Sequence, residues 1–469
     1  MKTLCSLLLC ACVCAGEIRI TGGAADDQVF QRSGSGSASI PLSGTTPGKN
    51  GDAVEARLVR KHVVMPGFDW TAIARVSAGA WSGELKNVPA GGPYRVEIRS
   101  AGSNAAVNNL LVGDLWVLAG QSNMQGVGDL ADLEMPHELV HNFDMADRWV
   151  VAEEPLHSLQ TALDPVHWAK GQTAPLAGEA LQRSLASRRK GAGLGLPFAV
   201  EMVKRTGVPI GLLSCAHGGT SMDQWDPALR NKAGESLYGS MYRRVKAAGG
   251  RVTGVLWYQG ESDANPKAAP VFLQKFERLV SSIREDFGLP ELPFYYVQIG
   301  RHVNDSNVAE WNLVQDMQRR AEKTISRAGM ATAADLSLDD GIHVSTPDLK
   351  RLGRRFANLA TNPARPGPRP ASAKFDNGIV RVAFSGVNGR LQAPGRLSGF
   401  SVHSAEGALL PLIYKMRVDP ADPSAVLLHV GGKIPSGATL RYGSGKDPYC
   451  NLRDSADMAL PVFQGVAIE

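Results

Sequence analysis

The pattern of apolar and polar positions begins with strict alternation. Between residues 17 and 110 it is clearest in "AVEARLVRKHVV" (53–64), "WTAIARVS" (70–77) and "YRVEIRS" (94–100). Stretches rich in Gly, Ser and Pro separate these segments, and none of them has helical periodicity. A period of two is typical of half-buried β-strands. We therefore expect an N-terminal antiparallel β-domain over residues 17–110, built as a β-sandwich.

From residue 111 the pattern changes to short, continuous apolar runs. They are "LLVGDLWVLAG" (110–120), "VPIGLLSCA" (208–216), "VTGVLWY" (252–258), "LPFYYVQIG" (292–300) and "AGMATAADL" (328–336). Segments with a period near 3.6 alternate with these runs, which predicts helices over 196–207, 268–287 and 345–360. In the last of them, Ser345 and Thr346 are cap candidates and Pro347 falls in the first turn.

Apolar strands that alternate with amphipathic helices predict an α/β domain, a parallel sheet with helices on both faces. We place this domain at 111–362, with a less regular insertion at 129–195 that shapes a cleft. A Pro-rich linker, "TNPARPGPRPAS", leads into a strand-and-turn pattern, so 363–469 is expected to be a second, sandwich-like β-domain.

The first 16 residues resemble a secretory signal peptide, with Lys2, a short apolar run and small residues before the expected cleavage near Gly16. We therefore expect a secreted or periplasmic protein. The "LCAC" context of Cys12 leaves a lipid-anchored form as a minor alternative. No other stretch is long and apolar enough to span a membrane.

The net charge and the cysteine and histidine content argue against several classes of function. A formal charge of +5, from 50 basic and 45 acidic residues without long runs, does not favour nucleic acid as a partner. Cys215 and Cys450 are the only cysteines beyond the predicted signal peptide, and the sequence does not decide whether they pair. No Cys/His spacing resembles a zinc site, so no metal or other cofactor is expected.

Candidate chemistry begins at Ser122, directly after the apolar run "DLWVLAG". Gly, Ser and Asn are also ordinary turn residues, so the position alone does not separate a strand end from a nucleophile. Parallel strands present their carboxyl ends at one edge of the sheet, where ligand sites form. A serine hydroxyl at that edge is a weak nucleophile until a base, oriented by an acid, accepts its proton.

Of the ten histidines, only His343 lies just beyond a predicted core strand and has an acidic residue three positions earlier. In "LDDGIHVSTPDLK", Asp340 precedes His343 by three residues, and a tight turn brings the two side chains together. Asp340 then fixes the imidazole tautomer, and Asp339 is an alternative acid. His343 is expected to accept the Ser122 proton and to return it to the leaving alcohol.

Two further loops after strands offer hydrogen-bond donors. Gly218 and Gly219 in "HGGTSMDQW" expose backbone N–H groups, and Gln259 in "QGESDA" offers a side-chain amide. Taken alone, the glycine pair is explained by an ordinary turn, and Gln259 is explained by a hydrogen-bonded strand cap. Together, four strand ends that each carry one part of an acyl-transfer site favour a serine hydrolase.

Several other residues are weaker candidates. His217 has no preceding acid, so a structural or substrate-contact role is preferred. Trp225 could offer an apolar face to a sugar ring. Glu261 and Asp263 share one loop rather than flanking a cleft, which favours loop bracing over a glycosidase pair.

These motifs, in this order, resemble the sialate O-acetylesterase family of SGNH hydrolases. The matching stretches are "GQSNM" (120–124), "GGTSMDQW" (218–225), "WYQGESDA" (257–264) and "DDGIHVSTPDLKRLGRRFANLA" (339–360). The resemblance implies an SGNH-type, flavodoxin-like sheet and a triad of Ser122, Asp340 and His343. It also implies an oxyanion hole made of the Ser122 N–H, a glycine N–H from Gly218 or Gly219, and Gln259.

The implied activity is hydrolysis of acetyl esters on sugars through an acyl-enzyme, with an acetylated sugar or glycan as the partner. Activity is expected to fall as His343 protonates in mild acid. Three alternatives remain: an esterase acting on acetylxylan or another polysaccharide, a carbohydrate-binding surface protein without catalysis, and a lipid esterase. A lipid esterase predicts a large exposed apolar patch near Ser122.

Overall fold

The computed structural model describes residues 17–469. The predicted signal peptide, and with it the Cys12 context, lies outside these described residues. The chain divides into two compact units, one ending at Val112 and the other running from Gly113 to Glu469.

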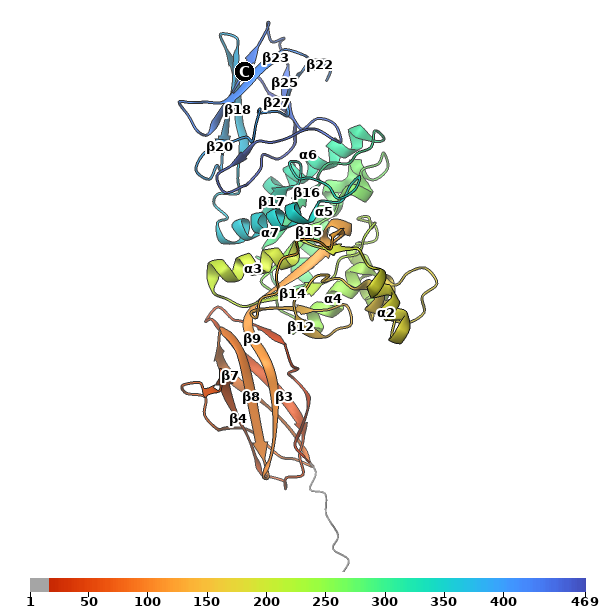
Figure 1. Ribbon diagram of the computed structural model, residues 1–469, viewed down its shortest axis with the longest axis vertical. Helices are drawn as coiled ribbons and strands as arrows, with labels where there is room; N and C mark the ends of the chain where they lie inside the picture. Colours follow the sequence, from red (N-terminus) through yellow and green to blue (C-terminus); the bar gives the residue numbers. More distant parts are fainter. Residues whose placement is uncertain (1–16) are drawn as a thin grey trace, which may run out of the picture. The chain divides into compact units, whose positions relative to one another are not determined.

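The described part of the first unit consists of strands and turns, because its sequence alternates throughout (Figure 1). One antiparallel sheet has the order β1-β3-β7, and in a second sheet β4 pairs with β5, β6 and β8, while β8 pairs with β9. The strands are β1 (Arg19–Gly22), β2 (Val29–Gln31), β3 (Ser37–Thr45), β4 (Ala53–Arg60), β5 (Val63–Val64), β6 (Thr71–Arg75), β7 (Ala80–Pro89), β8 (Gly91–Ser100) and β9 (Ser103–Gly120).

Inward-facing residues of both sheets form one apolar cluster. Ile40 and Leu42 of β3 belong to it together with Leu58 of β4 and Val96 of β8, all almost fully buried. Their polar neighbours along each strand face outward, as the period of two requires.

The second unit is built on a mixed sheet with the order β12-β11-β14-β9-β15-β16-β17. All neighbours from β11 to β17 are parallel, and β12 pairs antiparallel with β11. The strands that join β9 are β11 (Val140–Phe143), β12 (Trp149–Val151), β14 (Ile210–Ser214), β15 (Gly254–Tyr258), β16 (Phe294–Gln298) and β17 (Ala328–Thr332). Their continuous apolar sequences reflect burial on both faces.

Helices cover both faces of this sheet (Figure 1). They are α2 (Gly178–Ser187), α3 (Gly195–Thr206), α4 (Leu237–Ala247), α5 (Phe272–Phe287), α6 (Val308–Thr324) and α7 (Thr346–Thr361). On strand β16, Tyr296 packs against Phe276 of α5 and donates a hydrogen bond to α6. Trp116 of β9 stacks with Tyr295 of β16 and contacts Phe198 of α3, and α3 packs on α7. The predicted sheet covered by helices is therefore confirmed, although the sheet is mixed.

The predicted helix stripe at 268–287 is fully buried. Phe272, Phe276, Leu279, Ile283 and Phe287 all lie in the core face of α5. A short 3-10 turn, η5 (Ala269–Val271), precedes the helix.

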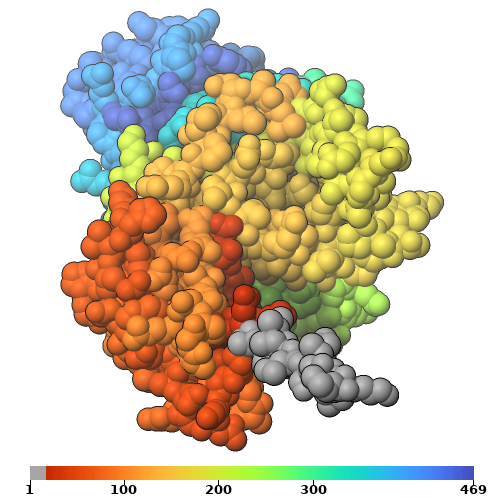
Figure 2. Space-filling view, turned by 60° about the horizontal axis from the view of Figure 1, so that its bottom comes forward, coloured from red at the N-terminus to blue at the C-terminus, as the bar shows by residue number. Residues whose placement is uncertain are grey.

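The segment predicted as an insertion, 129–195, contains elements of its own. It supplies strands β11 and β12 of the main sheet, helix α2, and β13 (Lys190–Ala192), which pairs with β10 (Gly128–Asp129). It also holds the 3-10 turns η1 (Leu159–Thr161) and η2 (Pro165–His167). In Figure 2 this segment, coloured orange-yellow to yellow, forms a continuous surface of the second unit.

The C-terminal part of the second unit is rich in strands. Two four-stranded sheets, β18-β19-β24-β23 and β22-β21-β25-β27, share one apolar cluster, and β20 pairs with β26. The strands are β18 (Arg369–Asp376), β19 (Ile379–Ser385), β20 (Leu391–Gln392), β21 (Phe400–His403), β22 (Leu409–Leu410), β23 (Ile413–Val418), β24 (Ala425–Val430), β25 (Thr439–Tyr442), β26 (Arg453–Asp454) and β27 (Phe463–Ala467).

Buried polar contacts attach these strands to the α/β sheet. Arg355 of α7 is 1% exposed, pairs with Asp335, and donates to the backbone carbonyl of Asp457. Gln298 of β16 donates to the carbonyl of Val462.

Cys215 and Cys450 are both buried and free in this structure. Within residues 17–469, no helix has the length and apolar character needed to cross a bilayer.

Candidate active site

Ser122 lies where strand β9 gives way to the short helix α1 (Ser122–Gln125). The chain turns at Gly120, whose φ of +132° favours glycine. A Cβ atom on Gly120 would lie 2.2 Å from the carbonyl oxygen of Tyr258 in β15, so any larger residue would push the two strands apart. The Gln121 N–H donates to the same carbonyl at 2.8 Å. This turn places Ser122 at the carboxyl edge of the sheet.

His343 and Asp340 meet through the tight turn that the sequence predicts. The Nδ1 atom of His343 lies 2.8 Å from Oδ2 and 3.0 Å from Oδ1 of Asp340. The backbone N–H groups of Ile342 and His343 donate to Asp340 Oδ1 at 3.0 and 2.9 Å. The carboxylate is therefore fixed by its own turn, and it orients the imidazole through Nδ1 so that Nε2 can serve as the base.

The neighbouring acid, Asp339, has different partners. It accepts hydrogen bonds from the backbone N–H groups of Asp129 and Thr346, at 2.9 and 3.1 Å. The structure therefore pairs Asp340, and not Asp339, with the histidine ring.

A lysine that sequence reasoning missed also contacts this acid. Lys190 of β13 places Nζ 2.8 Å from Oδ2 of Asp340. Partial burial opposes ionisation of Asp340, but the hydrogen bonds from Lys190, Ile342 and His343 outweigh it and hold the pKa of Asp340 well below its usual range. The carboxylate thus stays ionised opposite His343.

Asn123 connects the turn that carries Ser122 to two other loops. Its Nδ2 donates to Oε1 of Glu261 at 2.9 Å, and its Oδ1 accepts the Val344 N–H at 3.0 Å. Asn123 is 2% exposed, and burial of the Glu261 carboxyl raises its pKa. Glu261 therefore braces the loops from inside, which agrees with the role expected for it.

One open cavity of about 490 Å³ brings several of the predicted residues together. Its lining consists of Gln121, Ser122, Gln125, Val127, Gly218, Gly219, Glu261, Ser262, Ile342 and His343. Strand ends that are distant in sequence, namely those of β9, β14, β15 and the 340–343 turn, thus converge on one surface.

The two candidate glycines differ in their relation to Ser122. A Cβ atom on Gly218 would lie 3.3 Å from the Cβ of Ser122, whereas one on Gly219 would meet no atom within 4 Å. The Gly218 N–H donates to Oε1 of Gln125 at 2.7 Å. A carbonyl-type oxygen therefore already occupies the hydrogen-bonding position that Gly218 offers beside Ser122.

Gln259 and Trp225 lie away from this cavity. The Gln259 amide is fully buried and donates to the Thr220 carbonyl at 3.1 Å and to Asp263 Oδ2 at 2.5 Å. Trp225 is fully buried, packs edge-on against Trp257 and donates to Thr220 Oγ1, so it has no face open to a sugar in this conformation.

His217 has a buried hydrogen-bond chain behind it that the sequence did not reveal. Ser240 Oγ donates to Oδ2 of Asp164 at 2.5 Å, so it accepts from Nε2 of His167, 3.2 Å away. Nδ1 of His167 then accepts from Nδ1 of His217 at 3.1 Å. Burial lowers the pKa of both imidazoles, which favours the neutral tautomers that this chain requires. His217 consequently keeps an unprotonated Nε2.

In chemical terms, the cavity combines a hydroxyl, an imidazole held by a carboxylate, and backbone N–H donors. Such a set suits acyl transfer. Across residues 17–469, no group of three or more His, Cys, Asp or Glu side chains is arranged to hold a metal ion.

Comparisons with known proteins agree with this chemistry. Residues 112–362 match the family described as carbohydrate esterase, sialic acid-specific acetylesterase. A probable carbohydrate esterase of Arabidopsis thaliana is 29% identical over 269 residues, which cover 52% of this chain and 88% of the plant protein. Human sialate O-acetylesterase is 23% identical over 300 residues, and the match spans 56% of each protein.

Among solved structures, a carbohydrate acetylesterase from Xanthomonas citri has a similar fold. It aligns with a TM-score of 0.64 and 23% identity, over 95% of this chain and 99% of that one.

Proposed function

The chain belongs to the sialic acid-specific acetylesterase family of carbohydrate esterases, and we propose that it hydrolyses acetyl esters on sugars with Ser122 as the nucleophile. The family implies a hydrolase that acts on acetyl esters. The observation that carries the assignment of residues is the shared cavity lined by Ser122 and His343, with Asp340 bound to the far side of the imidazole.

In the proposed acylation step, Ser122 Oγ attacks the acetyl carbonyl while His343 Nε2 accepts its proton. Asp340 stabilises the imidazolium that forms. The tetrahedral intermediate collapses, and His343 returns the proton to the departing sugar hydroxyl. The acetyl group is then bound to Ser122.

In the second half-reaction, water enters in place of the sugar. His343 takes a proton from this water as it attacks the acetyl-serine, and the proton passes to Ser122 when acetate leaves. The chain's own side chains therefore supply every proton transfer in the cycle.

We propose the Ser122 and Gly218 N–H groups as oxyanion donors. The Ser122 N–H stands at the start of α1, where the helix itself provides no acceptor. Gly218 is favoured over Gly219 because it lies closer to Ser122, and Gln125 Oε1 must leave its N–H when substrate binds. Gln259 stays a prediction as a third donor, and that role requires its amide to exchange Thr220 and Asp263 for the substrate oxygen.

An O-acetylated sialic acid is the substrate that the family description supports best, and an acetylated polysaccharide such as acetylxylan is the alternative. His217, with its free Nε2 next to Gly218, is proposed as a contact for a sugar hydroxyl. Trp225 could assist only if the loop around it opens. A lipid substrate has less support, because Val127 and Ile342 are the only aliphatic side chains among the described residues that line the cavity.

The strand order of the α/β domain and the N-terminal residues extend this proposal. The order β14-β9-β15-β16-β17 supports a flavodoxin-like arrangement of the SGNH domain. Export through a signal peptide over residues 1–16 is proposed from the sequence, and N-terminal sequencing of the exported protein tests it.

The test of the nucleophile is the Ser122→Ala chain, assayed for acetate release from an aryl acetate and from O-acetylated sialic acid, acetylxylan and acetylated pectin. We expect kcat to fall by about 10⁴-fold or more, as for other serine hydrolases that lose the nucleophile. Ser281→Ala, the same change on the exposed side of α5, is the control. Turnover by Ser122→Ala close to that of the wild type would contradict the mechanism.

A further inference from the structure

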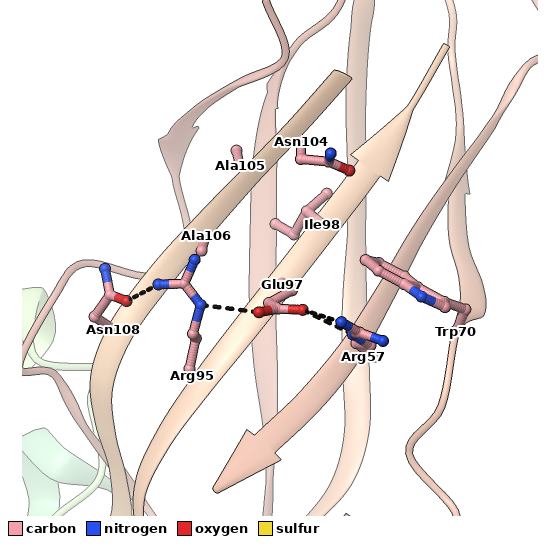
Figure 3. Close-up of a pocket in the computed structure, with 9 residues that line it drawn as sticks. All are labelled: Arg57, Trp70, Arg95, Glu97, Ile98, Asn104, Ala105, Ala106 and Asn108. Carbon is pink, nitrogen blue, oxygen red and sulfur yellow. Dashed lines mark hydrogen bonds and ion pairs between the residues drawn. The ribbon is translucent and has the colours of Figure 1, made fainter. Parts of the chain in front are cut away.

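The first unit carries a polar groove on the outer face of its sheet, within strands β4, β8 and β9. The groove has a volume of about 490 Å³, and Figure 3 shows the side chains that line it. A continuous row of hydrogen bonds crosses its floor: Arg57 and Arg95 both donate to Glu97, and Arg95 also donates to Asn108. The row ties three neighbouring strands together through their side chains.

This row orients two guanidinium groups without using all their donors. Glu97 Oε2 accepts from Nε and Nη2 of Arg57, and its Oε1 accepts from Nε of Arg95. Burial opposes the charge on Glu97, but the bonds from Arg57 and Arg95 outweigh it and lower its pKa. Within the described residues, no partner is found for Nη1 of Arg57, Nη2 of Arg95 or the exposed amide of Asn104. Two guanidinium groups against one carboxylate leave the floor with a net positive charge.

Trp70 forms one wall of the groove and is held in place by cations. The guanidinium of Arg57 lies 4.6 Å from the indole centroid, and that of Arg99 lies 4.2 Å from it. Arg99 is itself paired with Glu55 at 2.7 Å, and it is not among the residues that line the groove. On the opposite side, Ala106 of β9 keeps the groove open because its side chain is short.

An oriented aromatic ring beside planar hydrogen-bonding groups suits a pyranose. The ring's apolar C–H face packs on an aromatic side chain, while its hydroxyl groups meet donors and acceptors around it. The guanidinium N–H groups without a partner and the net positive charge of the groove floor favour a ligand that carries a carboxylate. Arg binds a carboxylate through two parallel hydrogen bonds.

We propose that this groove is a second, non-catalytic site that binds carboxylate-bearing sugar residues of a glycan. Arg57 and Arg95 hold the carboxylate, Asn104 contacts a hydroxyl group, and Trp70 packs against the ring. The choice of a sugar among carboxylates rests on the proposed function. A glycan held here raises the local concentration of acetylated residues around the enzyme, as any second binding module does.

The experiment measures equilibrium binding to the full chain that carries Ser122→Ala, by titration calorimetry. The probes are an oligomer of sialic acid without O-acetyl groups, a de-esterified oligogalacturonate and a neutral xylo-oligosaccharide. We expect saturable binding of the two acidic probes, weaker binding at high salt, and at least tenfold weaker binding of the neutral one.

Variants in the same background locate the site. Arg95→Met and Trp70→Ala are each expected to weaken binding of the acidic probes by about tenfold, in line with a lost charged hydrogen bond or stacking contact. Arg75→Met on β6 is the matched control, since Arg75 belongs to the same unit but donates to the Gly51 carbonyl and does not line the groove. Arg95→Gln keeps an amide donor while it removes the charge, and it serves as the second variant if Trp70→Ala fails to fold.

Equal binding of neutral and acidic probes, or acidic binding unaffected by both Arg95 variants, would overturn the proposal. The probes contain no ester and the Ser122→Ala background performs no acyl transfer. A failure of the proposed hydrolase would therefore leave this measurement intact, and a failure of the groove would leave the hydrolase untouched.

Discussion

The junction made by Asn123 offers a direct test of how the active-site loops are held. In an Asn123→Ala chain, the carboxylate of Glu261 loses the hydrogen bond from Nδ2, and the Val344 N–H loses its acceptor. The Val344 N–H stays buried, since Val344 is 1% exposed, and the other oxygen of the Glu261 carboxyl, Oε2, is already buried without a partner among the described residues. His343 lies directly between two residues that Asn123 contacts, Ile342 and Val344, so the position of the proposed base depends on the same side chain.

The expected size of the effect follows from these contacts. A buried polar group without its partner costs about 1–3 kcal/mol, so two such groups lower the free energy of unfolding by about 3–4 kcal/mol. A displacement of a reacting group by about 1 Å costs on the order of 10²-fold in rate. We therefore expect kcat for an aryl acetate to fall by about 10²-fold, with a smaller change in KM.

The assay combines urea unfolding with kcat measured per folded molecule. Asn142→Ala is the matched control, because Asn142 is equally buried and makes two hydrogen bonds, to Leu156 and Ser214, on strand β11. It should lose a similar amount of stability while kcat stays within about threefold. If Asn123→Ala lost stability to the same extent but kept its kcat, the junction would not position His343, and the reasoning would fail.

Three further predictions concern stability. Burial raises the pKa of Glu154 from 4.5 to about 7, so its contribution to stability is complete below the unfolded value and is lost as the pH rises through about 7, a change of about 3 kcal/mol. Urea unfolding at pH 5 and pH 8 should show this decline, and a Glu154→Gln chain that keeps it would contradict the assignment. Arg355→Met leaves the buried Asp335 with a weaker set of partners and should lower the free energy of unfolding by about 3 kcal/mol, whereas a loss below about 1 kcal/mol would mean that the pair is not needed. Asp340 has a lowered pKa, so its contribution is present above the unfolded value and is lost as the pH falls below about 4. In Lys190→Met this acid-induced loss of stability should shrink, and an unchanged acid profile in urea titrations would contradict the role given to the ion pair.

The strands and helices that sequence reasoning found are those with a strong periodic signal. The five apolar runs correspond to β9 and β14 to β17, because strands buried on both faces consist of continuous apolar residues. Helix α7 begins at Thr346, after Ser345 and just before Pro347, as the cap and first-turn residues indicate.

Elements without such a signal were missed. Strand β11 has only four residues, and its sequence includes the buried polar side chains of His141 and Asn142. Helix α6 faces the core partly through Gln315 and Gln318, whose amides bond the backbone of neighbouring strand ends, including Ile299 and Gln259. Glutamines are usually exposed, so a hydrophobic pattern does not identify this face as buried.

The candidate active-site residues also divide into those whose role the sequence indicated and those whose side-chain contacts it did not reveal. Ser122 and His343 could be proposed from sequence because each follows a core strand, and strand ends share one edge of a parallel sheet. The Gln259 amide follows a strand in the same way, yet Thr220 and Asp263 take up both of its donor contacts. The sequence therefore predicts that a residue lies at the edge of the sheet. The hydrogen-bond partners of its side chain determine whether that side chain faces the cavity.

The surroundings of His217 show why the segment 129–195 matters to the site. The partners of His217 are His167, 50 residues earlier, and then Ser240 and Asp164, reached through the second imidazole. His167 and Asp164 both come from the segment 129–195, whose irregular pattern gave no sign of a contact with the loop that carries Gly218. Because Asp164 accepts from Ser240, every later hydrogen bond in the chain has one possible direction, and it ends at a neutral His217 with Nε2 unprotonated. The segment thus reaches the loop that carries Gly218 through a buried hydrogen-bond chain, which starts at the Asp164 carboxylate and fixes the tautomer of His217.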